Sequence, residues 1–183
     1  MSTERKIIFA GPVGAGKTTA IGAISDIPVV GTEGTATDDA ALRKAKTTVA
    51  MDYGVLHLAD GGKVHLYGAP GQDRFDFMWD ILTIGGIGLV LMLDQARPDP
   101  VADLEHYMKA FGAFVERTGG AMVVGISRMD LCPGSTIKPV REKLLAMGLN
   151  VPVFEVDARS RADVRQLLLA LLSQLDPSVR RFR

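Results

Sequence analysis

The sequence is poor in cysteine, in net charge and in long apolar runs, and each shortage excludes a class of protein. Cys132 is the only cysteine among 183 residues, which excludes an intramolecular disulfide and a cysteine-rich zinc site and is typical of a reducing compartment. The 21 Lys and Arg residues balance 21 Asp and Glu residues, so no overall field draws the chain to nucleic acid. We therefore expect a cytoplasmic protein without a nucleic-acid partner.

No apolar stretch is long enough to cross a bilayer. The longest runs from Ile81 to Leu93, and one threonine and three glycines interrupt it. The N-terminus passes directly into a short apolar run, which predicts no secretion signal. With 47% hydrophobic residues the chain can bury a core, and its length favours one domain. We expect that domain over residues 1–178, a basic tail over 179–183 and no integral membrane segment.

Apolar, β-branched runs alternate with segments of helical period, a pattern typical of βα units and a largely parallel sheet. The turn signal at residues 60–62 (Asp-Gly-Gly) predicts an antiparallel hairpin between the second and third strands. The sequence thus predicts an α/β fold with a six-stranded, mostly parallel sheet, one antiparallel strand and helices on both faces. The predicted strands are 5–10, 49–58, 63–68, 87–94, 121–126 and 152–156, and the predicted helices are 17–25, 73–83, 100–117, 137–147 and 161–174.

Residues 11–18 read G-P-V-G-A-G-K-T and fit the phosphate-loop pattern G-x-x-x-x-G-K-[ST]. The segment follows a predicted strand and precedes a predicted helix, the context that a P-loop NTPase requires. Backbone N–H groups in such a loop point at phosphate, Lys17 is expected to reach the β and γ phosphates, and the Thr18 hydroxyl is expected to bind Mg²⁺. The nucleotide-binding residues predicted here are Gly11, Val13, Gly14, Ala15, Gly16, Lys17, Thr18 and Thr19.

Two further segments are candidates for sensing the γ phosphate. Thr48 opens a predicted strand after a long loop without apolar period, where a threonine completes the Mg²⁺ shell in the triphosphate state, and Thr47 competes for this role. After the next strand, Gly71 lets the chain approach the γ phosphate and Gln72 is placed to orient attacking water. A strand threonine without metal and a plain Pro-Gly turn are the alternatives for these two segments.

The stretches 46–54 and 68–80 resemble the Ras-like small GTPases, and within them the bacterial branch of MglA-like and conservon-encoded GTPases. The resemblance covers nearly the whole chain. It implies GTP and GDP with Mg²⁺ as ligands, slow hydrolysis that a partner stimulates, and a role in bacterial signalling. It also implies a roadblock-type regulatory protein as partner and a cytoplasmic location, with peripheral association at the inner membrane face as a second option.

One departure from that family concerns the metal. Gly68 stands where Ras-like proteins place the Asp of D-x-x-G, the carboxylate that holds Mg²⁺ through water. Magnesium is then expected to rest on Thr18, Thr48, phosphates and water. The carboxylates that remain as candidate replacements are Asp38, Asp39 and Asp73.

Base recognition in the family depends on two loops, N-K-x-D and S-A-K. Residues 127–130 (Ser-Arg-Met-Asp) and 157–159 (Asp-Ala-Arg) stand in their places, each after a predicted strand. By this resemblance Asp130 accepts hydrogen bonds from the guanine N1 and amino group, and the Ala158 N–H donates to O6. Ser127 replaces the usual Asn and makes fewer hydrogen bonds. The nucleotide-binding set is completed by Gly71, Ser127, Arg128, Asp130, Ala158 and Arg159, of which the two arginines line the base. Ordinary loop roles are the alternative for these residues.

The catalytic residues predicted are Gln72, Lys17 and Arg43, the last as a positive charge supplied in cis, for which Arg74 is a competitor. Two other functions compete with a GTPase switch. A nucleotide-binding scaffold with little turnover is motivated by the departures at Gly68 and Ser127. An ATP-dependent kinase is the third hypothesis, but the sequence has no evident acceptor-site motif for it.

Overall fold

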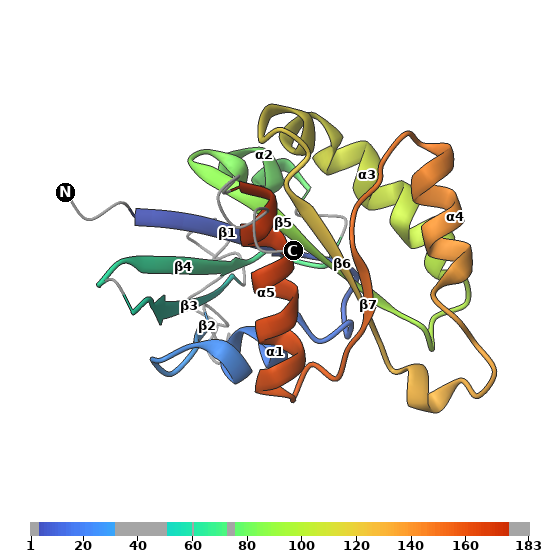
Figure 1. Ribbon diagram of the computed structural model, residues 1–183, viewed down its shortest axis with the longest axis horizontal. Coiled ribbons are helices and arrows are strands. Elements are labelled where there is room, and N and C mark those ends of the chain that lie inside the picture. Colours follow the sequence, from blue (N-terminus) through green and yellow to red (C-terminus); the bar gives the residue numbers. More distant parts are fainter. Residues whose placement is uncertain (1–3, 32–50, 60, 73–75, 176–183) are drawn as a thin grey trace, which may run out of the picture.

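The computed structural model describes residues 4–31, 51–59, 61–72 and 76–175 (Figure 1). Seven strands and five α-helices are assigned in these ranges, with one 3₁₀ turn at Met129–Leu131. The strands are β1 (Glu4–Ala10), β2 (Val30–Gly31), β3 (Asp52–His57), β4 (Lys63–Gly68), β5 (Gly86–Asp94), β6 (Met122–Ser127) and β7 (Val153–Glu155), and the helices are α1 (Lys17–Ile24), α2 (Phe77–Thr83), α3 (Pro100–Arg117), α4 (Lys138–Ala146) and α5 (Arg161–Leu175).

The strands form one sheet in the order β2-β3-β4-β1-β5-β6-β7. Strand β1 pairs in parallel with β4 and β5, and β5, β6 and β7 continue the parallel part. Strand β3 runs antiparallel to both of its neighbours, and its first residue, Asp52, lies opposite Gly68, the last residue of β4. The carboxyl ends of the parallel strands and the amino end of β3 therefore lie at the same edge of the sheet.

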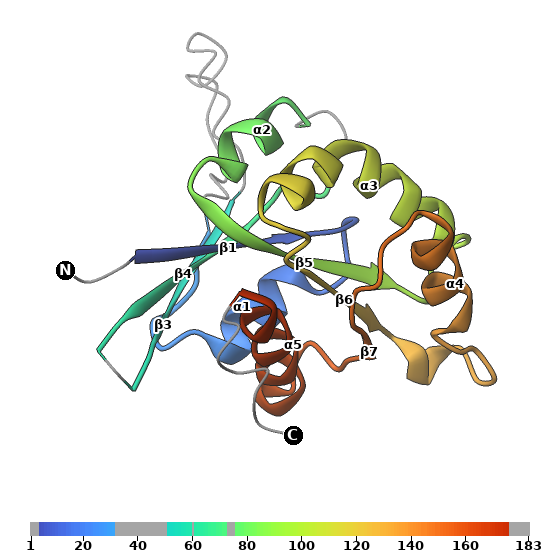
Figure 2. The ribbon, with the colours of Figure 1, turned by 45° about the horizontal axis from the view of Figure 1, so that its top comes forward.

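Alternate residues of the central strands pack into two separate hydrophobic clusters. Ile8 and Ala10 of β1 belong to the cluster that includes residues of α2, α3 and α4. Ile7 and Phe9 belong to the cluster on the other face, which includes residues of α1 and α5. Figures 1 and 2 show these two helix layers on opposite sides of the sheet. Burial on both faces explains why the central strands read as nearly continuous apolar runs.

The predicted α/β architecture with a mostly parallel sheet is confirmed, and the predicted hairpin joins β3 and β4. The predicted strand count is wrong, because the described residues contain seven strands and not six. The missed strand, Val30–Gly31, pairs with Tyr53 and Asp52. Two residues are too few to show a period, so the sequence pattern could not reveal this strand.

Some predicted boundaries also shift. The predicted strand 49–58 begins at Asp52 and ends at His57, and the helix predicted over 73–83 begins at Phe77. No helix in the described ranges is both long and apolar enough to span a membrane. Several residues and one segment singled out in the sequence lie outside the described residues, namely Asp38, Asp39, Arg43, Thr47, Thr48, Asp73, Arg74 and the tail 179–183.

Candidate functional site

The loop between β1 and α1 folds around the side chain of Lys17. Its ammonium group donates hydrogen bonds to the carbonyl oxygens of Gly11, at 2.6 Å, and Pro12, at 2.9 Å. The Lys17 side chain is buried, and this burial lowers its pKa from 10.5 to about 8, while the nearby Asp52 carboxylate acts in the opposite direction. Lysine is thus held inside the loop that the sequence predicts to bind phosphate.

Thr18 and Asp52 meet at the edge of the sheet where β3 begins. The Thr18 hydroxyl donates a hydrogen bond of 2.5 Å to the Asp52 carboxylate. A hydrogen bond to an ionised acceptor is about twice as strong as one between neutral groups. A carboxylate therefore lies beside the threonine of the phosphate loop, although Gly68 removes the one that Ras-like proteins place at the end of the neighbouring strand.

The absence of a side chain at Gly68 makes room for Asp52. A β-carbon added at Gly68 would lie 3.0 Å from the Asp52 β-carbon and 3.1 Å from its Oδ2 atom. Those separations are tighter than ordinary van der Waals contact, and the Ile21 Cδ1 atom would lie at 3.2 Å, so a side chain at position 68 would require its neighbours, Asp52 among them, to shift by a few tenths of an ångström. The register pairs the two residues directly, and only one of them carries a carboxylate.

Gly71 lies directly against the phosphate loop. A β-carbon added there would come within 2.6 Å of the Val13 nitrogen and 2.9 Å of the Lys17 ammonium. The same segment is held from the other side by two aromatic side chains: the Trp79 indole N–H donates to the Pro70 carbonyl at 3.0 Å, and the Tyr107 hydroxyl donates to the Gly71 carbonyl at 3.4 Å. The segment is thus fixed between the phosphate loop and helices α2 and α3.

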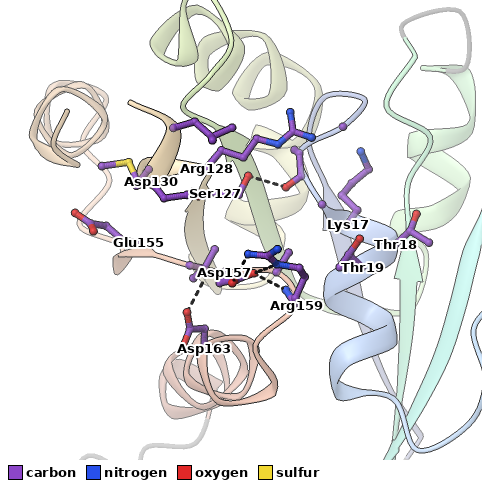
Figure 3. Close-up of a pocket in the computed structure, with 17 residues that line it drawn as sticks. Lys17, Thr18, Thr19, Ser127, Arg128, Asp130, Glu155, Asp157, Arg159 and Asp163 are labelled. Carbon is purple, nitrogen blue, oxygen red and sulfur yellow. Dashed lines mark hydrogen bonds and ion pairs between the residues drawn. The ribbon is translucent and has the colours of Figure 1, made fainter. Parts of the chain in front are cut away.

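A cavity of about 1010 Å³ extends from the phosphate loop to the ends of β6 and β7. Figure 3 shows Lys17, Thr18 and Thr19 on one side and Asp130 and Glu155 on the other. This volume is at the upper end of the range for small-molecule sites. The lining residues are Gly14–Thr19, Ser127–Leu131, Glu155–Arg159 and Asp163.

Ser127 connects the two ends of this cavity. Its side chain is buried, and its hydroxyl lies 2.9 Å from the Ala15 carbonyl of the phosphate loop and 3.1 Å from the Leu93 carbonyl of β5. A hydroxyl has one proton to donate, so it serves these two acceptors in turn. Serine therefore ties the segment after β6 to the phosphate loop even though it is shorter than asparagine.

The opposite wall carries an ion pair between exposed side chains. Asp157 accepts two hydrogen bonds of 2.9 Å from the Arg159 guanidinium and one of 2.9 Å from the Arg159 backbone N–H. These bonds lower the pKa of Asp157 from 3.8 to about 2. The Asp157 N–H donates to Asp163, which also accepts a hydrogen bond from Ser160 at the start of α5. Arg159 is thereby held at the mouth of the cavity.

Most predicted nucleotide-binding residues gather around this cavity. Gly14 to Thr19, Ser127, Arg128, Asp130, Ala158 and Arg159 line it. Gly11, Val13 and Gly71 do not line it, and Gly71 instead contacts the loop from the side of β4. Gln72 is exposed one residue beyond Gly71, whereas Arg43 and Thr48 lie outside the described residues.

Sequence reasoning missed the position of Asp52, although the sequence carries a signal for it. The turn predicted at residues 60–62 defines a hairpin centred near residue 60, and such a hairpin pairs position 52 with position 68. Asp94, buried at the end of β5, was also missed because it looks like the end of an apolar run.

The donors near the phosphate loop suit a hard cation. No group of three or more His, Cys, Asp or Glu side chains in the described ranges is arranged to hold a metal. Thr18 and Asp52 supply one hydroxyl and one carboxylate instead. Mg²⁺ is commonly held by one or two protein oxygens together with phosphate oxygens and water, so these residues could hold it only with a phosphate-bearing ligand.

Comparison with known proteins adds a family and two relatives. Residues 28–171 match the family described as "conserved hypothetical ATP binding protein", and this match begins after the phosphate loop. An uncharacterized protein of Methanocaldococcus jannaschii is 34% identical over 77 residues, which are 39% of this chain and 49% of the relative. The GTP-binding protein ypt1 of Schizosaccharomyces pombe is 20% identical over 141 residues, which are 75% of this chain and 69% of the relative. The chain thus spans about half the length of the first relative.

The lowered pKa of Lys17 predicts a pH dependence of ligand binding. In the free protein Lys17 loses its proton above pH 8, whereas a bound phosphate favours the charged form and raises the pKa. Binding therefore takes up a proton, and affinity should fall about threefold between pH 7.5 and 8.5 by linkage.

Isothermal titration with GDP in buffers of different ionisation enthalpy measures both the affinity and the proton uptake. The control is the Lys17→Arg variant, because its guanidinium stays charged. The GDP affinity of this variant should not change between pH 7.5 and 8.5. A wild-type affinity that stays constant or rises with pH would contradict the prediction.

Proposed function

The chain belongs to the family of conserved hypothetical ATP-binding proteins, and from this premise we propose that it is a switch that binds GTP with Mg²⁺ and hydrolyses it to GDP. The observation that carries the proposal is a single cavity whose walls combine the phosphate loop with the segments after β6 and β7. A purine nucleoside triphosphate would occupy both ends of this cavity at once, with its phosphates at the phosphate loop and its base at the segments after β6 and β7. The similarity to a GTP-binding protein supports the choice of nucleotide class.

Guanine is favoured over adenine by the acidic wall of the cavity. Asp130 is exposed there, in the turn after β6, and a carboxylate accepts the N1 and amino hydrogens that guanine presents. Adenine has an acceptor at N1 and would leave the carboxylate without a partner, a loss of about 1–3 kcal/mol. Ala158 is buried at the end of the cavity, and its N–H would donate to guanine O6.

Magnesium would be held by Thr18 and Asp52 beside the phosphate loop. Both offer hard oxygen donors, and their hydrogen bond of 2.5 Å brings the carboxylate next to the phosphate loop. Thr48, outside the described residues, is the further ligand proposed from the sequence. When bound, the ion neutralises charge that develops on the phosphate oxygens.

Hydrolysis in this proposal depends on Lys17 and Gln72. Lys17 holds the β and γ phosphates by exchanging its hydrogen bonds to Gly11 and Pro12 for bonds to phosphate oxygens. Gly71 lies against the phosphate loop, and in this proposal the carboxamide of the next residue, Gln72, would orient a water for attack. Arg43 is the proposed source of positive charge in cis.

An apolar stripe on α2 supports a protein partner. Phe77 and Ile81, one helical turn apart on α2, are 58% and 61% exposed, and Ile84, the extended residue that follows the helix, is 70% exposed. The stripe of these three side chains follows the Gly71 segment along the chain. A roadblock-type regulatory protein is the partner implied by the resemblance. The alternative function, a nucleotide-binding scaffold with little turnover, would use the same stripe equally in every nucleotide state.

Base selectivity is tested by Asp130→Ala. We expect the wild-type protein to bind GTP at least about tenfold more tightly than ATP, the equivalent of about 1.4 kcal/mol, and the variant to lose this preference. Glu155→Ala is the matched control, because it removes another exposed carboxylate from the same wall. Competition titrations of both nucleotides measure the ratio, and an unchanged ratio in Asp130→Ala would reject the assigned role.

Catalysis is tested by Gln72→Leu. We expect phosphate release from GTP to fall at least about a hundredfold while the nucleotide affinity stays within about threefold, since the side chain acts on water and not on the nucleotide. Gln166→Leu, an exposed glutamine of α5, is the control. Single-turnover phosphate release, with and without a stimulating partner, is the measurement. Hydrolysis at the native rate in Gln72→Leu would exclude this role, and no release from the wild-type protein would favour the scaffold.

A further inference from the structure

Asp94 is a buried carboxylate for which the proposed mechanism has no use. It is the last residue of β5 and is 2% exposed, and its register partner in β6 is Ser127. Four polar or charged side chains are buried in the part of the chain that the structure describes, and three of them, Lys17, Asp94 and Ser127, belong to or adjoin the nucleotide cavity. A carboxylate in such a position needs a partner, because burying an unpaired charge is strongly unfavourable.

The partner of Asp94 is Arg128, a residue of the cavity wall. The Arg128 guanidinium donates from Nη1 to Asp94 Oδ2 at 2.9 Å, while the other carboxylate oxygen accepts the Ala96 N–H at 2.9 Å. The two side chains differ in exposure, with 48% for Arg128 and 3% for Asp94. The arginine therefore has one end fixed by a buried charge and the rest of its side chain available to a ligand.

Two features show that the position of Arg128 is constrained. Its φ angle is +59°, and among the described residues it is the one non-glycine with a positive φ. Its other terminal nitrogen, Nη2, lies 3.9 Å from where a β-carbon of Gly14 would be, so the guanidinium lies beside the phosphate loop. The ion pair thus places one side chain between the phosphate loop and the base end of the cavity.

Stability alone is a weak reason for this arrangement. A buried ion pair is often no more stabilising than well-packed apolar side chains of the same volume, because both charges must leave water. A preorganised guanidinium, in contrast, favours binding because a long, flexible side chain no longer has to be ordered when the ligand arrives. Its planar face can also pack against a purine ring.

We propose that Asp94 is a positioning residue that holds Arg128 in place as the wall against which the nucleoside part of the bound nucleotide packs. This inference rests on the proposed nucleotide-binding function. It assigns Asp94 no contact with the nucleotide itself, and it predicts that Asp94 acts on the nucleoside and not on the phosphates.

The test compares GDP with inorganic tripolyphosphate, which uses the phosphate loop and lacks a base. In Asp94→Asn we expect GDP to dissociate about tenfold faster and to bind about tenfold more weakly, while tripolyphosphate binding changes less than about twofold. Asp103→Asn is the matched control, because it breaks another Arg–Asp ion pair, between Arg97 and Asp103, which also follows β5 in the chain. This variant should change neither the GDP affinity nor the tripolyphosphate affinity.

A double-mutant cycle keeps the test independent of folding. Arg128→Gln should weaken GDP binding by a similar factor, and Asp94→Asn with Arg128→Gln, which leaves no unpaired buried charge, should be no weaker than either single variant. Equal losses for GDP and tripolyphosphate, or additive losses in the double variant, would overturn the inference. If the wild-type protein binds neither GDP nor GTP, the proposed function fails and this inference fails with it. If the wild-type protein binds GDP and the ratio of GDP affinity to tripolyphosphate affinity is the same in Asp94→Asn, only the role of Asp94 is rejected.

Discussion

The carboxyl ends of parallel strands lie at one edge of a sheet, and the candidate site depends on this constraint. The phosphate loop follows β1, the Gly71 segment follows β4, and the segments proposed to recognise the base follow β6 and β7. After β1, the chain first adds strands on the β4 side of β1 and then adds strands on its β5 side. The strand order therefore reverses at β1, and α/β sheets bind ligands at the carboxyl ends of the strands where this reversal occurs. Strand β3 runs the opposite way, so its first residue, and not its last, reaches the same edge.

That reversal brings a carboxylate to the edge of the sheet where Gly68 supplies none. Asp52 starts the antiparallel strand opposite Gly68, and its carboxylate accepts a hydrogen bond from Thr18 of the phosphate loop. The two positions cannot both carry side chains without displacement, since an added β-carbon at Gly68 would lie 3.0 Å from that of Asp52. A departure that looks like the loss of a metal ligand on one strand thus accompanies a carboxylate on its neighbour. Asp94 is a second carboxylate at a strand end on this edge of the sheet, and its buried charge pairs with an arginine on the wall of the cavity.

The sequence predicts those parts of the molecule that have a local signature. The phosphate-loop pattern has a fixed spacing, and its segment lies between a strand and a helix as predicted. The central strands are apolar on both faces and are located to within one residue. The two-residue strand at Val30 is missed because pairing with β3, and not local pattern, creates it. The position of Asp52 depends on the register of the hairpin, and the role of Asp94 depends on the approach of Arg128, which follows a different strand, β6. Contacts between distant segments decide such positions, and a linear pattern does not contain them.

The central claim is that Asp52 takes the place of the carboxylate that Gly68 lacks, and moving the carboxylate tests it directly. The measurement is the Mg²⁺ concentration that gives half of the maximal slowing of GDP release. It is made on Asp52→Gly and on the double variant Asp52→Gly with Gly68→Asp. The first variant should need at least about tenfold more Mg²⁺, and the second, in which the close contact between the two side chains is gone, should return to within about threefold of the wild-type requirement. An unchanged Mg²⁺ requirement in Asp52→Gly, or no recovery when the carboxylate stands at position 68, would contradict the account.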